Sequence, residues 1–110
     1  MKVSELKEKL SLTLKAGSDG IENDASGCYI GDLLSLAMAK VEQKNVWVTI
    51  QSNINIVAVA SLSEAACIIL AEGVVPDENA AKKADMEGIP LLTSEKSAYE
   101  IAVMLSECGI

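Results

Sequence analysis

The sequence predicts a single α/β domain over residues 1–110, with three layers in which helices flank a mostly parallel sheet. Two runs of apolar and β-branched residues, 46–50 and 66–71, are typical of strands that are buried on both faces. Segments with helical spacing follow such runs, so strand and helix alternate along the chain. Half of the residues are apolar, which is enough for one core at this length.

Residues 1–16 predict a short helix followed by one strand. Ser4 is expected to cap the helix, because its side-chain oxygen can accept a bond from a free backbone N–H. Residues 11–16 alternate between apolar and polar side chains, which predicts a strand with one covered face. The side chains expected on that face are Leu12, Leu14 and Ala16.

A turn, a short strand and a second helix are predicted next. Residues 17–20 (GSDG) are typical of a turn. Gly27 and Gly31 bracket a short strand, and Asp32 is expected to cap the helix that follows it. The apolar spacing of that helix continues to a point near Gln43.

The middle of the chain predicts a strand, a polar loop and a helix. Residues 46–50 form the strand, and residues 51–55 (QSNIN) form the loop. Residues 54–62 are ambiguous, since their Ile and Val content favours a strand and their position before the next strand favours a helix. We interpret them as a helix, because two strands joined by so little chain could not run parallel.

The last third of the chain predicts two more strands and two more helices. After the strand at 66–71, residues 77–87 predict a polar helix that ends at Gly88, and residues 89–92 predict a strand. The last helix has two candidate caps, Ser94 or Ser97, and a stop at Gly109. Its apolar face carries Ile101, Met104, Leu105 and Cys108.

Charge and composition exclude several classes of function. The formal net charge of −7 argues against binding to nucleic acid or to an anionic membrane, because both need a basic surface. Histidine is absent, which removes histidine-based catalysis and most designs of zinc site. The charged start of the chain is not typical of a signal peptide, and the longest apolar run is far shorter than the roughly 18 residues that span a bilayer. We therefore expect a cytoplasmic protein.

No motif of an enzyme or of a cofactor site is present. The phosphate-binding patterns G-x-x-x-x-G-K-[ST] and G-x-G-x-x-G are absent, and without histidine no Ser-His-Asp triad can form. The cysteines are widely spaced and are expected to be reduced, free of disulfides and free of metal: Cys28, Cys67 and Cys108. We expect no catalytic residue, no metal and no cofactor.

Polar residues after two predicted strands form the candidate ligand site. In open α/β sheets, the carboxyl ends of parallel strands converge on one crevice where ligands bind. The candidate ligand-binding residues are Gln51, Ser52, Asn53, Asn55, Thr93 and Ser94. The alternative interpretation is that these side chains cap a helix and satisfy the turn.

Four segments of the chain resemble the DRTGG domain family, which is related to the N-terminal domain of HPr kinase/phosphorylase. The segments are residues 27–35, 49–60, 88–92 and 97–102. The resemblance covers nearly the full length and is greatest to short stand-alone members. After Thr49 the family typically carries glycines and a charged pair, where this chain reads IQSN, so any role of those glycines does not carry over.

The resemblance implies a regulatory or interaction domain without an established activity. Such domains are found beside nucleotide-sensing CBS domains and are usually dimeric, and stand-alone members are often encoded beside iron-hydrogenase or ferredoxin-linked genes. We therefore expect a non-enzymatic, ligand-sensing, nucleotide-responsive homodimer linked to redox or hydrogenase metabolism. The apolar surplus of this small chain also favours a homodimer. The alternative is a protein-interaction subunit that docks on a partner enzyme and binds no small molecule.

The first prediction is that the purified protein does not transfer phosphate from ATP to serine, although similar stand-alone domains are sometimes labelled serine kinases. The reason is that the chain lacks a phosphate-binding loop to hold ATP. Incubation with labelled ATP and a candidate partner should leave the partner unlabelled. Stoichiometric phosphorylation that disappears when this protein is mutated would contradict the prediction.

Overall fold

Helices and strands alternate along the chain in the computed structural model, which describes residues 1–110. The helices are α1 (Val3–Lys9), α2 (Leu34–Lys40), α3 (Asn55–Leu62), α4 (Glu78–Glu87) and α5 (Ala98–Glu107), with a short 3-10 helix, η1 (Ser18–Gly20). The strands are β1 (Thr13–Ala16), β2 (Cys28–Ile30), β3 (Val46–Thr49), β4 (Cys67–Leu70) and β5 (Leu91–Thr93). None of the helices has the length and apolar character that crossing a bilayer requires.

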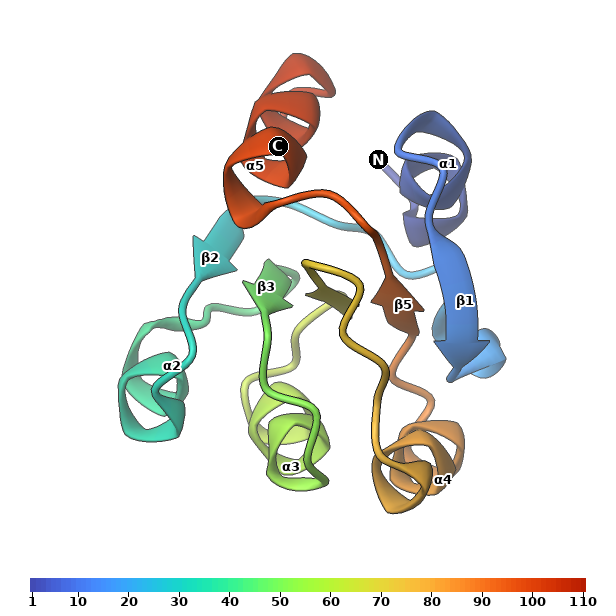
Figure 1. The fold of residues 1–110 in the computed structure, drawn as a ribbon, viewed down its shortest axis with the longest axis vertical. Helices are drawn as coiled ribbons and strands as arrows, with labels where there is room; N and C mark the ends of the chain where they lie inside the picture. Colours follow the sequence, from blue (N-terminus) through green and yellow to red (C-terminus); the bar gives the residue numbers. More distant parts are fainter.

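The five strands form one sheet in the order β1-β5-β4-β3-β2. Strands β2, β3, β4 and β5 run parallel to one another, and β1 pairs antiparallel with β5. Helices α2, α3 and α4 cover one face of the sheet, and α1 and α5 cover the other (Figure 1). The predicted three-layer α/β fold with a mostly parallel sheet is confirmed.

Strands β3 and β4 lie in the middle of the sheet, and all of their residues are buried. Their side chains alternate between two apolar clusters, one on each face of the sheet. The cluster beneath α2, α3 and α4 takes Trp47, Ile68 and Leu70, and the cluster beneath α1 and α5 takes Val48, Cys67 and Ile69. Burial on both faces explains why these strands read as uninterrupted apolar runs in the sequence.

The ambiguous segment 54–62 contains a helix, α3, as interpreted from the sequence. Because β3 and β4 pair in parallel, the chain between them crosses over one face of the sheet, and α3 makes this crossing. The buried side chains of α3 are Ile56, Val57, Val59 and Ala60. Packing against the sheet therefore outweighs the preference of Ile and Val for strands.

Strand β1 departs from the predicted alternation at its end. Leu12 and Leu14 pack on the side of α1 and α5, whereas Ala16 belongs to the cluster on the opposite face. The register shifts between Leu14 and Ala16, which pair with consecutive residues of β5, so the residue between them is unpaired. The prediction that all three side chains share one face is wrong for Ala16, because an extra residue reverses the facing of the next side chain.

Two predicted helix caps and one helix end are wrong. Helix α1 begins at Val3, ahead of Ser4, because the helix start is at Lys2, whose backbone N–H donates to the Glu5 carboxylate (3.0 Å). Helix α2 has no side-chain cap, because the Asp32 carboxylate accepts hydrogen bonds from the end of β3 instead. The same helix ends at Lys40, before the predicted end near Gln43, because the chain becomes extended at the next residue.

Two other helix ends match the sequence. The Ser97 hydroxyl oxygen accepts a bond from the Glu100 backbone N–H (3.2 Å), and the Glu100 carboxylate accepts one from the Ser97 N–H (3.1 Å). Ser97, rather than Ser94, is therefore the cap of α5. The hydrogen bond from the Ser97 backbone lowers the pKa of the Glu100 carboxyl. Gly88 ends α4 in the left-handed conformation, as expected.

At Gly17, the chain after β1 lies close to α4 and to the segment that connects α4 to β5. Gly17 has a φ of +77°, and a Cβ at this position would lie 1.8 Å from the Ile89 carbonyl oxygen, so no other residue fits. The Gly17 N–H also donates to the Asp85 carboxylate on α4 (2.7 Å). The turn predicted at residues 17–20 is thus held against the sheet.

The second prediction is that Cys67 is the slowest of the three thiols to react in the native protein. Burial on β4 raises the pKa of the Cys67 thiol from 9.0 to about 12, so the reactive thiolate is scarce. Cys28 and Cys108 are not fully buried. Timed alkylation followed by mass spectrometry should modify Cys67 last, and this order should vanish in denaturant. Labelling of Cys67 ahead of both other thiols would show that β4 is misplaced.

Candidate functional site

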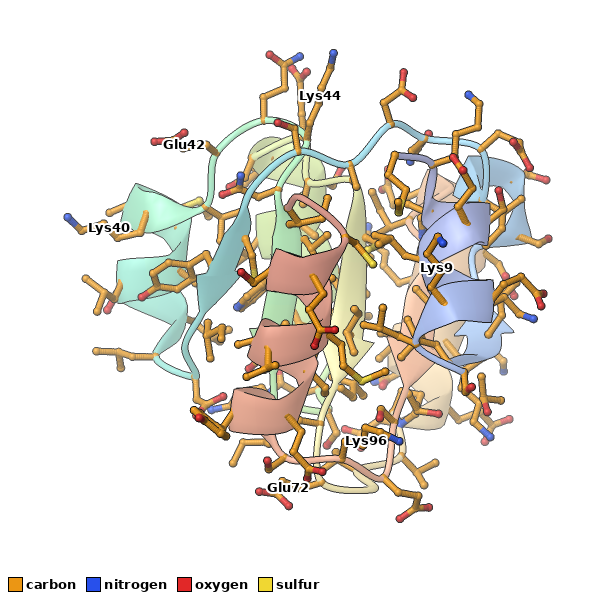
Figure 2. All side chains as sticks on the ribbon, turned by 90° about the horizontal axis from the view of Figure 1, so that it is seen from above. Lys9, Lys40, Glu42, Lys44, Glu72 and Lys96 are labelled. Carbon is orange, nitrogen blue, oxygen red and sulfur yellow. The ribbon has the colours of Figure 1, made fainter.

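The loops at the carboxyl ends of the parallel strands are linked to one another by hydrogen bonds. Residues after β2 bond to the β3 loop, the β3 loop bonds to the start of α4, and the loops after β4 and β5 bond to each other. Figure 2 shows Glu72 and Lys96, from the last two loops, at one end of the sheet, with Glu42 and Lys44 at the opposite end. Polar groups from four loops therefore share one edge of the sheet.

Asp32 organises the first part of this edge. Its Oδ1 atom accepts a bond from the buried Thr49 hydroxyl (2.8 Å) and another from the Ile50 backbone N–H (2.9 Å). The Gln51 side-chain amide donates to the Asp32 carbonyl oxygen (2.9 Å). Asp32 therefore holds the start of the β3 loop against the end of β2.

The amides of the β3 loop bond to each other. The Asn53 side-chain N–H donates to the Gln51 side-chain carbonyl (3.1 Å), and the Asn53 side-chain carbonyl accepts from the Asn55 backbone N–H (2.9 Å). The N-cap position of α3 is Ile54, which provides no side-chain cap, and Asn53 precedes it. The Asn53 side chain therefore satisfies the backbone N–H of the first helical residue from outside the helix, which is a capping role. The Asn55 side chain is exposed and makes no hydrogen bond.

Ser52 connects the β3 loop to the next helix. Its hydroxyl donates to the Asp77 carboxylate (3.1 Å), and its carbonyl oxygen accepts from the Asp77 backbone N–H (2.9 Å). Asp77 immediately precedes α4. The loop after β3 and the loop after β4 are therefore held together by a bond in each direction.

Thr93 and Ser94 line a cavity of about 200 Å³ at the carboxyl end of β5. The Ser94 carbonyl oxygen accepts from the Gly73 N–H (2.9 Å), and the Ser94 hydroxyl accepts from the Lys96 N–H (3.1 Å). Gln51, Ser52, Asn53 and Asn55 line none of the three cavities of the structure. The six candidate residues thus share one edge of the sheet but form two groups along it.

The candidate residues omit four polar residues of this cavity. One is Glu95, next to Ser94, and the other three belong to the segment of β1: Ser11, Thr13 and Lys15. Because β1 runs antiparallel to β5, its first residues lie at the carboxyl end of β5, and Thr13 pairs directly with Thr93. The polar alternation of residues 11–16 is the only local signal, and it does not reveal which strand is the neighbour.

The other two cavities lie away from this edge. The largest, of about 410 Å³, lies at the amino ends of the strands, where Glu64 and Glu87 mark the ends of α3 and α4. A third, of about 280 Å³, lies between α1 and α5 and includes Leu10 and Cys108. Open α/β sheets bind ligands at the carboxyl ends of their strands, so the cavity at Ser94 is the better candidate site.

The lining of the Ser94 cavity suits binding rather than bond-breaking chemistry. Hydroxyls of Ser11, Thr13, Thr93 and Ser94 can each donate or accept a hydrogen bond. Lys15 adds one cation and Glu95 one anion. This arrangement can recognise a polar ligand by hydrogen bonds.

Comparisons with known proteins agree on the family and the fold. The family profile of the DRTGG domain matches residues 5–108. Among solved structures, the chain is similar to the CBS and DRTGG domains of the regulatory region of Clostridium perfringens pyrophosphatase, complexed with its activator, diadenosine tetraphosphate. The TM-score is 0.77 at 9% sequence identity, and the match covers 94% of this chain but only 45% of that chain. A search of curated proteins found no match.

The third prediction is that Asn53→Ala lowers the free energy of unfolding by about 1 kcal/mol, the usual cost of losing a side-chain cap. The matched control is Asn55→Ala, which removes the same amide two residues later without breaking a side-chain hydrogen bond. Urea unfolding should show a loss for the first variant and no loss for the second. Equal stability of both variants would mean that Asn53 does not cap α3.

Proposed function

The chain belongs to the DRTGG domain family, and we propose that it is a non-enzymatic regulatory domain that senses a small polar ligand. The observation that carries this proposal is the cavity at the carboxyl end of β5, which Thr93 and Ser94 line. This is the edge at which open α/β sheets bind ligands. The likeness to a regulatory region crystallised with its activator supports the sensing role.

The size of the cavity defines how much of a ligand it holds. Pockets that enclose a whole ligand measure roughly 300–1,000 Å³. The cavity at Ser94 measures about 200 Å³, so it suits one polar group of a ligand whose remainder lies over the neighbouring loops. The lining carries one cation, Lys15, which can meet an anionic group, and one anion, Glu95, which can accept hydrogen bonds from hydroxyls. A nucleotide, with phosphates and ribose hydroxyls, has this chemistry.

The hydrogen bonds between loops offer a route from the cavity to the rest of the candidate site. The Gly73 N–H bonds to Ser94, and the same loop ends at Asp77, which bonds to Ser52. Ser94 is therefore connected to Ser52 through the loop after β4. A ligand bound at Ser94 can change the position of Ser52 through this loop. On this basis we include Gln51, Ser52, Asn53 and Asn55 in the proposed site as its second half.

A second candidate function is a protein-interaction subunit that docks on a partner enzyme. The observation in its favour is that large apolar side chains are exposed on α2 and at its start, including Leu33, Leu36 and Met38. The two candidates use different surfaces, since none of these residues lines a cavity. The expected link to redox or hydrogenase metabolism and the cytoplasmic location stay predictions from the sequence.

The fourth prediction is that a nucleotide stabilises the protein and that Ser94→Ala weakens this effect. A ligand at 100 times its dissociation constant adds about 2.7 kcal/mol to the free energy of unfolding. Loss of one hydrogen-bonding partner in the cavity should weaken binding by about 1–3 kcal/mol. A thermal-shift screen of nucleotides, followed by calorimetry on the best binder, measures both.

The control for this experiment is Ser106→Ala, which removes an exposed hydroxyl of α5 outside all three cavities. It should bind like the unmodified protein. Asn53→Ala adds a separate test of the β3 loop. If this variant loses stability but keeps full affinity for the ligand, the loop caps α3 and is not part of the ligand site. Full affinity in both Ser94→Ala and Thr93→Val would contradict the proposed site.

A further inference from the structure

Strand β2 leaves one edge of the sheet open. It pairs only with β3, and it lies at the outer end of the sheet beside α2 (Figure 1). The Gly27 carbonyl oxygen accepts from the Val46 N–H (2.9 Å), and the Gly31 N–H donates to the Val48 carbonyl oxygen (3.1 Å). Backbone groups alternate in direction along a strand, so the N–H and C=O groups of Cys28 and Ile30 point away from the sheet.

Exposed apolar side chains lie on β2, before α2 and on α2 itself. Ile30 is 43% exposed, Leu33 is 65% exposed and Leu36 is 45% exposed. We call these three residues, with Cys28 and Met38, the β2–α2 edge. A parallel edge strand with exposed aliphatic neighbours is a template for pairing with another strand.

The two edges of the sheet differ in how they are protected. Edge strands commonly carry lysine, proline or a bulge, which discourage pairing with other chains. Strand β1, at the opposite edge, has Lys15 and a register irregularity. Strand β2 reads CYI and has none of these devices. Only the β2–α2 edge is therefore open to pairing.

Charge favours a second copy of the chain as the occupant. In a twofold interface both copies bury the same patch, so a patch whose charges are mostly of one sign repels its counterpart. The chain carries a net charge of −7, yet residues 25–39 contain one charged side chain, Asp32. Its Oδ1 atom already accepts two hydrogen bonds within the fold. The β2–α2 edge is thus a surface that this acidic protein can place against itself without strong repulsion.

We propose that two copies pair through the β2–α2 edge, with their β2 strands antiparallel and centred on Tyr29. In this register Cys28 of one copy lies opposite Ile30 of the other, and each such pair exchanges both of its outward N–H···O bonds. The two five-stranded sheets become one continuous sheet. The α2 helices of the two copies then flank the junction and cover each other's exposed leucines.

The surface is separate from the cavity at Ser94, so this proposal does not rest on the proposed ligand. Failure of the dimer leaves the ligand experiments unaffected, and failure of ligand binding leaves the dimer unaffected.

The fifth prediction is that Ile30→Lys converts a dimer to a monomer. The unmodified protein should sediment at about 23 kDa, twice its chain mass of 11.6 kDa, at micromolar concentration. Ile30→Lys places two ammonium groups against the junction and should sediment as the single chain. Because Ile30 is partly exposed, the variant should keep its circular dichroism and the fluorescence of the buried Trp47. Leu62→Lys, at an exposed leucine of α3, is the matched control and should remain dimeric.

A monomeric unmodified protein would overturn the proposal and leave the β2–α2 edge for a different protein. A dimer that persists in both Ile30→Lys and Leu36→Lys would overturn it as well. The register has its own test in a Cys108→Ser background. Mild oxidation of Ile30→Cys should give a disulfide-linked dimer through Cys28, and Cys28→Ser should abolish it. Equal cross-linking without Cys28 would contradict the register.

Discussion

The burial of β3 and β4 on both faces is the constraint on which the rest of this structure depends. Each fully buried aliphatic side chain stabilises the fold by roughly 1.5–3 kcal/mol, and all residues of both strands are buried. Because the two strands are parallel, helices α3 and α4 make the crossings, which brings the loops after β3 and β4 to the same end of the sheet. The position of the candidate site is therefore a consequence of how the core is built.

Trp47 extends this core to the open edge of the sheet. Its ring is fully buried beneath α2 and α3, and its indole N–H donates to the Gly31 carbonyl oxygen (3.0 Å). A strand as short as β2 would be poorly held by its ladder alone, so this bond and the Gly31 bond to Val48 keep its end in place. The end of the proposed dimer edge is thus hydrogen-bonded to a fully buried side chain of the core.

Asp32 lies between the two surfaces that the proposals concern. It follows the β2 strand directly, and it bonds to Thr49 and to the Gln51 amide at the start of the candidate ligand loop. The proposed dimer surface and the β3 loop of the proposed ligand site therefore adjoin at this residue. The similar regulatory region has 9% sequence identity to this chain over the matched part, so the likeness extends to the fold and not to particular side chains.

Local patterns in the sequence determined the strands, the order of elements and the end of α4 at Gly88, because each depends on neighbours within a few residues. They limited the cap of α5 to Ser94 or Ser97, and the structure shows that it is Ser97. They also predicted which loops reach the carboxyl edge, since a parallel sheet places them there. Only the tertiary structure decided that Asp32 bonds to Thr49 rather than capping α2, and that Thr13 lies opposite Thr93 in the lining of a cavity. Both contacts join residues that are far apart in the chain. The contact between Thr13 and Thr93 depends on the pairing of β1 with β5, which cannot be predicted from the sequence of either segment alone.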